Sequence, residues 1–249
     1  MKVISLGTNG FFPSFGRQTA CYAIPYNKTL IVLDAGSGLF RFAETIGQRL
    51  LKEAEEIHLF LSHYHLDHTF GFYAAFKLFE GKKVTVFAPT DKKVFSDLAR
   101  EYFPIDYEKT HKNFMWQKLK IGENKTEKYS VGVRKQDHRG EGSLAFRFSF
   151  DLAYITDSEY SKEGIEFVRG VKLLLHEHYL TGSEKVYFDG KHVTTVGAAT
   201  IAKEANVRKL ALIHHYPFAD DKQLESQLKL AMTIFPNTIL AKDLEEMVY

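Results

Sequence analysis

The sequence predicts an α/β fold in which two β-sheets pack face to face and helices cover their outer sides, a four-layer αββα sandwich. Hairpin-like segments come first, strands alternate with helices in the middle, and strands return near the end. The strand candidates are too many for a simple parallel sheet. Of the 249 residues, 45% are hydrophobic and 14% aromatic, so the chain can bury a large core. We expect one domain spanning residues 1–249.

The strand candidates are short apolar runs bounded by turn residues. They cover residues 3–6, 21–25, 30–33, 57–61, 84–87, 129–133, 144–150, 153–155, 172–175, 209–213 and 238–240. The helix candidates cover residues 38–52, 67–79, 91–101, 161–168, 196–205 and 220–234, several of them opened by Asp or Ser in a capping position. The clearest amphipathic helix follows Asp220, with Leu224, Leu228 and Met232 at helical spacing.

Charge and cysteine content exclude several classes of protein. Lys and Arg number 33 against 31 Asp and Glu, and a net charge of +2 gives no strong attraction to nucleic acid or anionic membrane. No apolar run suits a signal peptide or a membrane span, so we expect a cytoplasmic protein. The lone Cys21 excludes an internal disulfide framework and a thiolate-rich zinc site. Eleven histidines are the unusual feature.

Four side chains that could bind a metal ion lie within one six-residue segment, His63-Tyr64-His65-Leu66-Asp67-His68. The segment connects a predicted strand to a predicted helix, where α/β folds place functional groups. Three imidazoles and one carboxylate suit zinc or another borderline divalent ion. One alternative is that these are surface histidines without a shared role. Another is a mononuclear structural zinc site, although closed structural sites usually depend on cysteine.

This pattern resembles the His-x-His-x-Asp-His motif of the metallo-β-lactamase superfamily, with a complete match at His63, His65, Asp67 and His68. The resemblance extends over nearly the whole chain and is closest to the ribonuclease Z-like branch. The opening motif of that branch is similar to Leu6-Gly7-Thr8, Pro13-Ser14 and Arg17-Gln18-Thr19, and its acidic motif is similar to residues 33–38, which contain Asp34. The third, fourth and fifth motifs are similar to the segments around three further residues: His138 before 140–143, Asp157 after 153–156, and His214 before Pro217.

The resemblance implies a dinuclear metal site. His63, His65 and His138 would hold one ion, Asp67, His68 and His214 the other, and Asp157 would reach both. Two ions about 3.5 to 4 Å apart can lower the pKa of a shared water, which attacks as a metal-bridging hydroxide, and clamp a displacement at phosphorus. Zinc is the first expectation, but imidazole and carboxylate also accept manganese or iron. Asp34 would support the site by accepting a hydrogen bond from a ligand histidine, the alternative being a turn or capping aspartate.

Asp67 and His192 are the catalytic candidates. The segment around His192 resembles the Gly-His-Ser-Thr of ribonuclease Z-like enzymes, where the histidine can protonate the leaving oxygen, but Val193 stands in place of Ser. A plain capping loop is the alternative for His192. His214 is preferred over His215 from the family register, since successive strand residues point to opposite faces.

Other histidines and aromatics have a structural interpretation. The cluster at His176, Glu177 and His178 is interpreted as structural or as support for the site. His58 and His111 are expected to be packed or solvated. The stripe at Phe72, Phe76 and Phe79 is interpreted as core and not as a base-stacking platform.

Several functions share this ligand set. True metallo-β-lactamases carry cysteine where this chain has Asp157, and the intact second motif argues against a di-iron oxidoreductase. A phosphodiesterase ranks first and a thioester or lactone hydrolase second; a tRNA 3′-processing endonuclease and a non-catalytic metal-binding carrier are further alternatives. Ribonuclease Z enzymes insert a tRNA-gripping arm between the third and fourth motifs, but only 18 residues separate His138 from Asp157. We therefore expect a small phosphodiester substrate, a cyclic phosphate or short nucleotide, and neither long nucleic acid nor a membrane partner. Relatives of this kind are often dimers, so a homodimer is an expectation.

Overall fold

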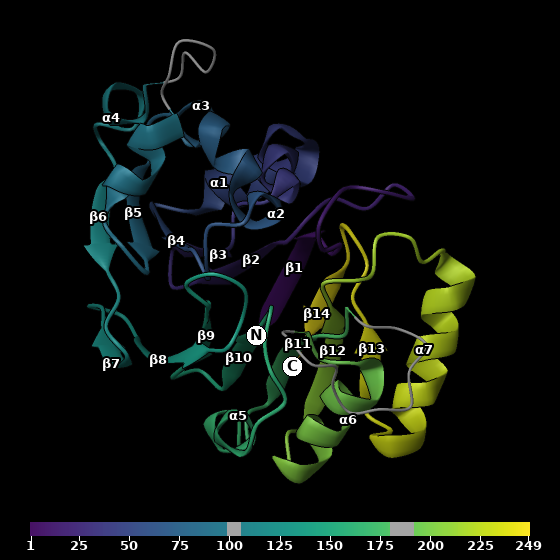
Figure 1. Cartoon of the computed structure of the whole chain (residues 1–249). Coiled ribbons are helices and arrows are strands. Elements are labelled where there is room, and N and C mark those ends of the chain that lie inside the picture. The colour runs from purple at the N-terminus through teal and green to yellow at the C-terminus, as the bar shows by residue number, and fades with distance from the viewer. Residues whose placement is uncertain (99–105, 180–191) are drawn as a thin grey trace.

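The computed structural model describes residues 1–98, 106–179 and 192–249, which form two seven-stranded sheets (Figure 1). The first sheet runs in the order β14 (Glu246–Val248), β1 (Lys2–Gly7), β2 (Cys21–Tyr26), β3 (Thr29–Leu33), β4 (Glu56–Phe60), β5 (Lys83–Ala88), β6 (Met115–Lys118). The second runs β13 (Thr238–Leu240), β12 (Lys209–Ile213), β11 (Leu173–Glu177), β10 (Leu152–Ile155), β9 (Ser143–Phe148), β8 (Ser130–Gln136), β7 (Gly122–Lys125).

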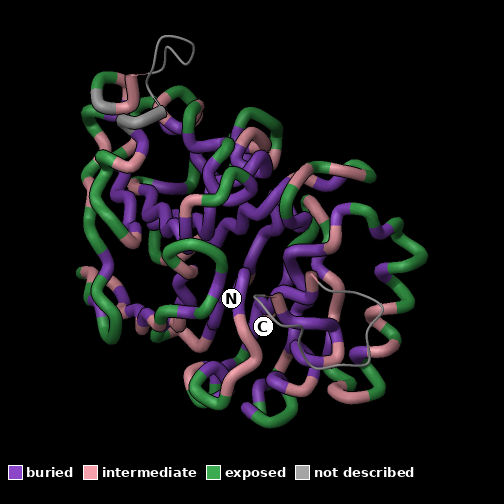
Figure 2. The backbone as a smooth tube through the Cα atoms, in the orientation of Figure 1, coloured by how far each residue is buried: buried purple, intermediate pink, exposed green. Residues whose placement is uncertain are grey.

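Both faces of each sheet are buried, and side chains alternate between them as the pleat requires. In β3, for example, Ile31 and Leu33 pack between the sheets, whereas Leu30 and Val32 face the helices. Figure 2 shows the central strands of both sheets as almost continuously buried. The central layer between the sheets contains aromatic residues from both, including Phe60 and Phe146, whose ring centroids are 5.5 Å apart. The predicted αββα sandwich is confirmed.

Helices cover the two outer faces. The first sheet packs against η1 (Ser37–Ala43), α1 (Thr45–Glu53), η2 (Phe70–Ala74) and α3 (Ala75–Leu78), with α2 (Leu66–Thr69), η3 (Lys92–Leu98) and α4 (Tyr107–Thr110) on the same side. The second sheet packs against α5 (Lys162–Phe167), α6 (Thr195–Glu204) and α7 (Asp221–Ile234). No helix in the described ranges is long and apolar enough to cross a membrane.

Two predicted helices are broken. The helix predicted over 38–52 is divided at Glu44, whose extended backbone (φ −88°, ψ 169°) ends η1 and begins α1. The helix predicted over 67–79 consists of three short pieces, because Gly71 lies against the chain after β3 and its amide donates to the Ala35 carbonyl at 2.8 Å. The helix predicted over 91–101 is the 3₁₀ segment Lys92–Leu98, and its last residues lie outside the described part.

Helix α7 begins where it was predicted to begin, but its apolar side chains are less buried than predicted. Asp220 caps α7 in a reciprocal capping box with Gln223. Leu224 is buried, yet Met232 is 43% exposed, so the stripe faces the core at one end only. Three strands were not predicted, β6, β7 and β14, because they are short edge strands whose residues are mostly exposed. Of the predicted core stripe, Phe72 and Phe79 are confirmed, since both are 1% exposed, whereas Phe76 is only half-buried.

The topology brings the functional segments to one edge. Strands β3, β4 and β5 are parallel in the first sheet, and β10, β11, β12 and β13 are parallel in the second. Ligand sites in parallel sheets form beyond the carboxyl ends of the strands. The His63 to His68 segment follows β4, and Asp157 and His214 follow β10 and β12. His138, the remaining predicted ligand, follows the antiparallel strand β8.

Candidate metal centre

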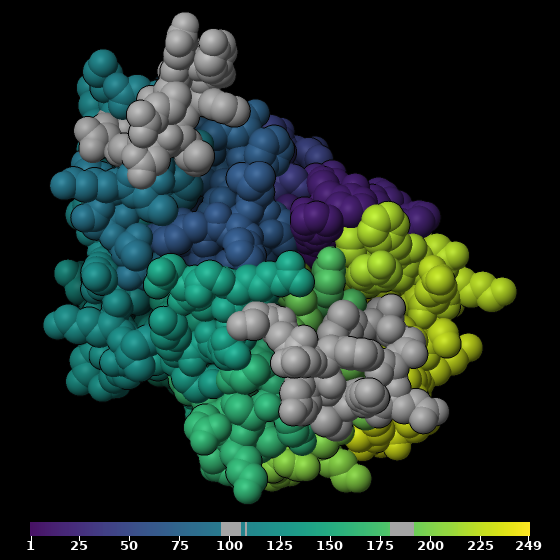
Figure 3. Space-filling model, viewed as in Figure 1, coloured from purple at the N-terminus to yellow at the C-terminus, as the bar shows by residue number. Residues whose placement is uncertain are grey.

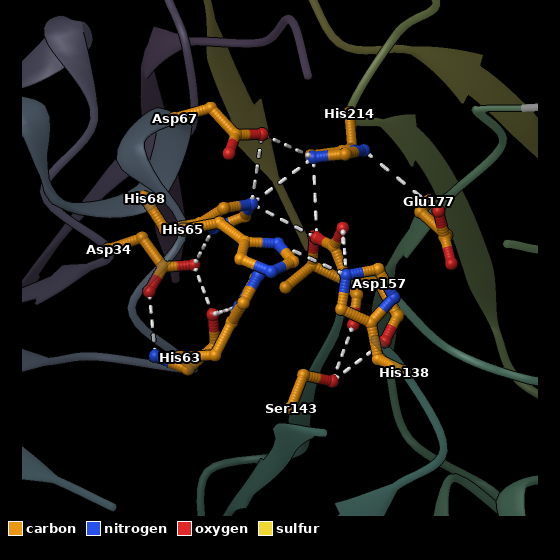
Figure 4. A network of polar contacts seen from close by, with 12 residues as sticks. Asp34, His63, His65, Asp67, His68, His138, Ser143, Asp157, Glu177 and His214 are labelled. Atoms are coloured by element: carbon orange, nitrogen blue, oxygen red, sulfur yellow. Dashed lines mark hydrogen bonds and ion pairs between the residues drawn. The ribbon is translucent and has the colours of Figure 1, made fainter. Parts of the chain in front are cut away.

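Among the described residues, three overlapping groups of side chains that could hold a metal ion converge where the two sheets meet, the third of them being Asp157, His192 and His214 (Figure 4). In the first group, ligand atoms of His63, His65, His138 and Asp157 all lie within 4.8 Å of one another. Asp67, His68 and His214 form the second group by the same measure. All seven side chains predicted as ligands are therefore together, although they come from four separate segments of the chain.

Strand ends with unusual backbone geometry hold three of the site's side chains. Asp34 directly follows β3 and has a φ of 58°. Asp157 lies two residues after β10 with a φ of 47°, and His214 directly follows β12 with a φ of 53°. A non-glycine residue in this left-handed region costs on the order of 1–3 kcal/mol and is retained where the surroundings fix it. Each left-handed residue turns the chain away from its strand and directs the side chain into the site.

Asp157 lies between the two groups of donors. Its Oδ1 is 3.3 Å from His138 Nε2, and its Oδ2 is 3.0 Å from His68 Nε2 and 3.3 Å from His214 Nε2. Thr156 fixes the carboxylate by donating to Oδ2 at 2.7 Å. The two oxygens of one carboxylate therefore face different half-sites.

Asp67 faces the second half-site. Its Oδ2 is 3.3 Å from both His68 Nε2 and His214 Nε2. The backbone amide of Phe11 donates to the same oxygen at 2.7 Å. The N-terminal loop, far away in sequence, is thus attached directly to this carboxylate.

Asp34 accepts a hydrogen bond from His68 on the side of the ring away from the other metal donors. His68 Nδ1 donates to Asp34 Oδ2 at 2.7 Å, while the Ser62 hydroxyl and the Tyr154 hydroxyl donate to the same oxygen at 2.8 and 2.6 Å. The Ser62 amide donates to the other oxygen at 2.7 Å. With the proton on Nδ1, a metal ion bound at the site would take the place of a second proton, and Nε2 of His68 would offer it a lone pair.

The donor set fits divalent metal ions. Donors about 2.0–2.2 Å from a tetrahedral ion lie roughly 3.3–3.6 Å from each other, close to the separations around Asp157. His68 Nε2 and His214 Nε2 are only 3.2 Å apart and both face carboxylate oxygens. Within the described residues, buried His63 Nε2 has no hydrogen-bond partner. A cation between these groups satisfies all of them.

The protonation of the histidines agrees with this fit. Burial, followed by the neighbouring His68, lowers the pKa of His63 well below its ordinary value, so His63 is a neutral donor. Burial also lowers the pKa of His68, but the charges of Asp67, Asp157 and Asp34 outweigh it and raise that pKa well above its ordinary value. Three carboxylates around one buried imidazole thus create a strong demand for positive charge.

His192 lies beside the site and is hydrogen-bonded to Glu177, which the sequence analysis interpreted as structural or as support for the site. His192 Nδ1 donates to Glu177 Oε2 at 2.7 Å and is 3.8 Å from Asp157 Oδ1. Burial lowers the pKa of His192, but the charge and hydrogen bond of Glu177 outweigh it and raise the pKa to about 9. The imidazole therefore holds a proton at neutral pH.

Glu177, at the end of β11, is fully buried and firmly held. Its Oε1 accepts from the amide and the hydroxyl of Ser158, the latter at 3.2 Å, and from the Val193 amide at 3.3 Å. Its Oε2 is also 3.9 Å from His214 Nδ1. The only sequence signal was its place at the end of an apolar strand beside the site.

The other histidines point elsewhere. His215 Nδ1 lies 2.7 Å from His178 Nε2, and its Nε2 donates to the Ala241 carbonyl at 2.8 Å, so it is turned away from the metal donors. His176 donates from Nδ1 to the Glu177 carbonyl. His58 and His111 pack among aromatic rings, at Tyr129 and Phe72.

Gly10 makes the close approach of the N-terminal loop possible. A Cβ at this position would lie 2.4 Å from Cε1 and 2.7 Å from both ring nitrogens of His214. We expect Gly10→Ala to displace His214 and to weaken zinc binding, while the fold is retained. Zinc competition titrations check this, with Gly132→Ala as a control, because a Cβ there meets nothing closer than 3.7 Å. Equal zinc affinity in both variants would contradict the expected displacement.

Comparisons with known sequences identify the family. The Beta-lactamase superfamily domain matches residues 29–215. Ribonuclease Z of Treponema denticola is 35% identical over 130 residues, which are 52% of this chain and only 41% of that protein. Ribonuclease Z of Oceanobacillus iheyensis is 25% identical over 304 aligned residues, covering 98% of both chains.

Solved structures show the same fold. The metallo-beta-lactamase fold protein YhfI from Bacillus subtilis superposes with a TM-score of 0.79 at 21% identity, covering 99% of this chain and 98% of that one. A diphosphatase from the PhnP family gives a TM-score of 0.75 at 15% identity, covering 100% and 97%. The match to most of the chain, together with two packed sheets that carry these donors at their shared edge, shows that this protein belongs to the metallo-β-lactamase superfamily.

Proposed function

We propose that this protein is a metal-dependent hydrolase with a dinuclear site that cleaves a small phosphodiester. The observation that carries the proposal is the Asp157 carboxylate, whose two oxygens face His138 on one side and His68 and His214 on the other. One carboxylate between two complete donor groups suits a pair of ions. Two relatives are named Ribonuclease Z, and one structural neighbour is a diphosphatase, which supports chemistry at phosphorus.

The proposed mechanism assigns a task to each side chain. His63, His65, His138 and Asp157 would hold one ion, and Asp67, His68, His214 and Asp157 the other. When bound, two divalent ions supply an activated water and neutralise charge on the phosphodiester. Asp34 keeps His68 in the tautomer that offers Nε2. His192, 16% exposed at its side chain, donates a proton from Nε2 to the leaving oxygen while Glu177 holds Nδ1.

The proposal of a small substrate rests on the segment between His138 and Asp157. Strands β9 and β10 are joined by a tight hairpin around Asp151, whose φ is 64°. The 18 intervening residues are thus occupied by two core strands and their turns, which leaves no length for a tRNA-gripping arm. The alignment to the Oceanobacillus protein spans 304 residues, longer than this 249-residue chain, so that relative carries insertions.

We expect turnover of small diesters and no correct 3′ processing of precursor tRNA. The measurements are cleavage of bis(p-nitrophenyl) phosphate and of cyclic nucleotides by the zinc- or manganese-loaded protein, and gel-shift and cleavage assays on precursor tRNA. A net charge of only +2 also predicts weak tRNA binding. Tight tRNA binding with a strong salt dependence and accurate cleavage would overturn the small-substrate proposal.

The same preparation separates phosphodiesterase from acyl hydrolase. A thioester and a lactone join the panel, because both are cleaved by enzymes with the same ligand set. Hydrolysis of either at rates above the diesters would favour the acyl class, and no turnover of any substrate by metal-loaded protein would favour a carrier. Zinc, manganese and iron are loaded in parallel, because the donors accept all three.

A further inference from the structure

A row of aromatic rings runs from the metal centre to the protein surface. Tyr179 stacks on His192 with ring centroids 4.4 Å apart and lies 5.4 Å from the His214 ring. The row continues through Tyr216, Phe218, Phe12 and Phe11, with successive centroids 5.5, 5.5, 5.2 and 5.4 Å apart. The inner end of the row contacts the proposed catalytic groups.

The outer end of the row is exposed. Phe11 is 66% exposed and Phe218 is 62% exposed, although each is a large apolar side chain. Single exposed aromatics are common on protein surfaces. These two belong to one cluster, however, and in Figure 3 the N-terminal segment (purple) lies beside the C-terminal segment (yellow-green) that carries Phe218. The exposed aromatic surface formed by Phe11 and Phe218 therefore lies beside the metal centre.

The backbone carrying these rings is fixed against the site. The Phe11 amide donates to Asp67 Oδ2 at 2.7 Å, and Phe11 adopts φ 60°, which is unfavourable for an aromatic residue. The Gly10 amide donates to the His215 carbonyl at 3.0 Å, and Ser14 donates to the Pro217 carbonyl. Two loops are thereby tied together. A flat ring placed on them would meet a preformed surface, which reduces the entropy lost on binding.

We propose that Phe11 and Phe218 form a stacking platform for a nucleobase of the substrate. This proposal rests on the proposed function, in which the phosphodiester occupies the metal centre. A base attached to that phosphate through its sugar can reach the rings, because Phe11 is bonded through its own amide to the carboxylate facing the second half-site. Aromatic rings stack any base without reading its edge. The platform selects nucleotides over diesters that lack a base.

The test compares adenosine 5′-monophosphate with ribose 5-phosphate, two ligands with the same phosphate and sugar. Binding to the zinc-loaded protein is measured by calorimetry. We expect wild-type protein to bind the nucleotide about 5- to 150-fold more tightly, the range that stacking of one base supplies. Phe11→Ala and Phe218→Ala should reduce this ratio with little change in ribose 5-phosphate binding, and Phe11→Trp should retain it.

Phe15→Ala is the matched control. Phe15 lies in the same loop, has φ 49° and is 58% exposed, but its ring faces the Arg17 guanidinium and not the row. This variant should keep the nucleotide preference. A loss in Phe15→Ala equal to that in Phe11→Ala would show that the loop was simply disturbed, and would overturn the platform.

Two further outcomes would also overturn it. Equal binding of both ligands by wild-type protein would exclude stacking. A change from dimer to monomer in sedimentation of Phe11→Ala, with no effect on the ligand ratio, would show that a second copy covers the rings. Because binding requires no turnover, a nucleotide preference without hydrolysis would refute the proposed function alone, and hydrolysis without a preference would refute the platform alone.

Discussion

Asp157→Ala should lower phosphodiester hydrolysis by about 10³-fold or more and reduce the metal content from two ions per chain, while the chain remains folded. The carboxylate faces both donor groups, so its removal takes one ligand from each half-site. Metal ions contribute several kcal/mol of charge stabilisation to such a transition state, which corresponds to this loss of rate. His63→Ala should have a similar effect, because His63 offers a buried nitrogen with no other use within the described structure.

Asp151→Ala is the control for that experiment. Asp151 precedes β10 as Asp157 follows it, also has a positive φ (64° against 47°), and forms an ion pair with Lys172 at 2.8 Å. Both variants carry comparable backbone strain, but only one touches the donors. Elemental analysis gives ions per chain and circular dichroism reports the fold. A single tightly bound ion, with activity surviving Asp157→Ala, would sink the two-metal proposal.

The fold was largely predictable because a short apolar run bounded by turn residues is a local signal. Leu30 to Leu33 form such a run, since both faces of β3 are buried. The edge strands lack this signal, and β7 (Gly122–Lys125) is nearly all polar. The break at Glu44 comes from the extended backbone of a residue that is neither proline nor glycine, so its residue type does not mark it.

The site was predictable only in part. Six adjacent residues carry the His63 to His68 pattern, so its chemistry is visible in the sequence. His138, Asp157 and His214 lie up to 151 positions from His63, and only the family resemblance connected them. Neither source revealed the Phe11 amide on Asp67, because a backbone donor leaves no trace in residue type. Glu177 was visible, but its hydrogen bond to His192 depends on how β11 and the chain before α6 are placed.

His192→Ala should slow turnover by about 10²- to 10⁴-fold on a diester with a poor leaving group, the usual contribution of general acid catalysis. An alkoxide leaving group must be protonated as it departs. In the proposed mechanism, His192 supplies this proton from Nε2, the ring nitrogen that is not hydrogen-bonded to Glu177. With p-nitrophenolate the loss should be much smaller, because that anion is stable without protonation. The ratio of the two losses, measured as kcat at saturating substrate, is the informative quantity.

Glu177→Gln tests whether the carboxylate acts through His192. A Gln amide has one oxygen, which the Ser158 and Val193 backbone amides require, so its NH2 group faces His192 Nδ1. The variant therefore loses both the acceptor at Nδ1 and the charge that raises the pKa of His192 to about 9. We therefore expect a smaller loss than in His192→Ala, with the same dependence on the leaving group, since both changes affect one proton. Equal losses on both substrates in His192→Ala would instead assign His192 to substrate binding or to packing against Tyr179, whose ring stacks on it. A general acid is distinguished from these by the leaving group alone, because neither binding nor packing depends on the pKa of the departing oxygen.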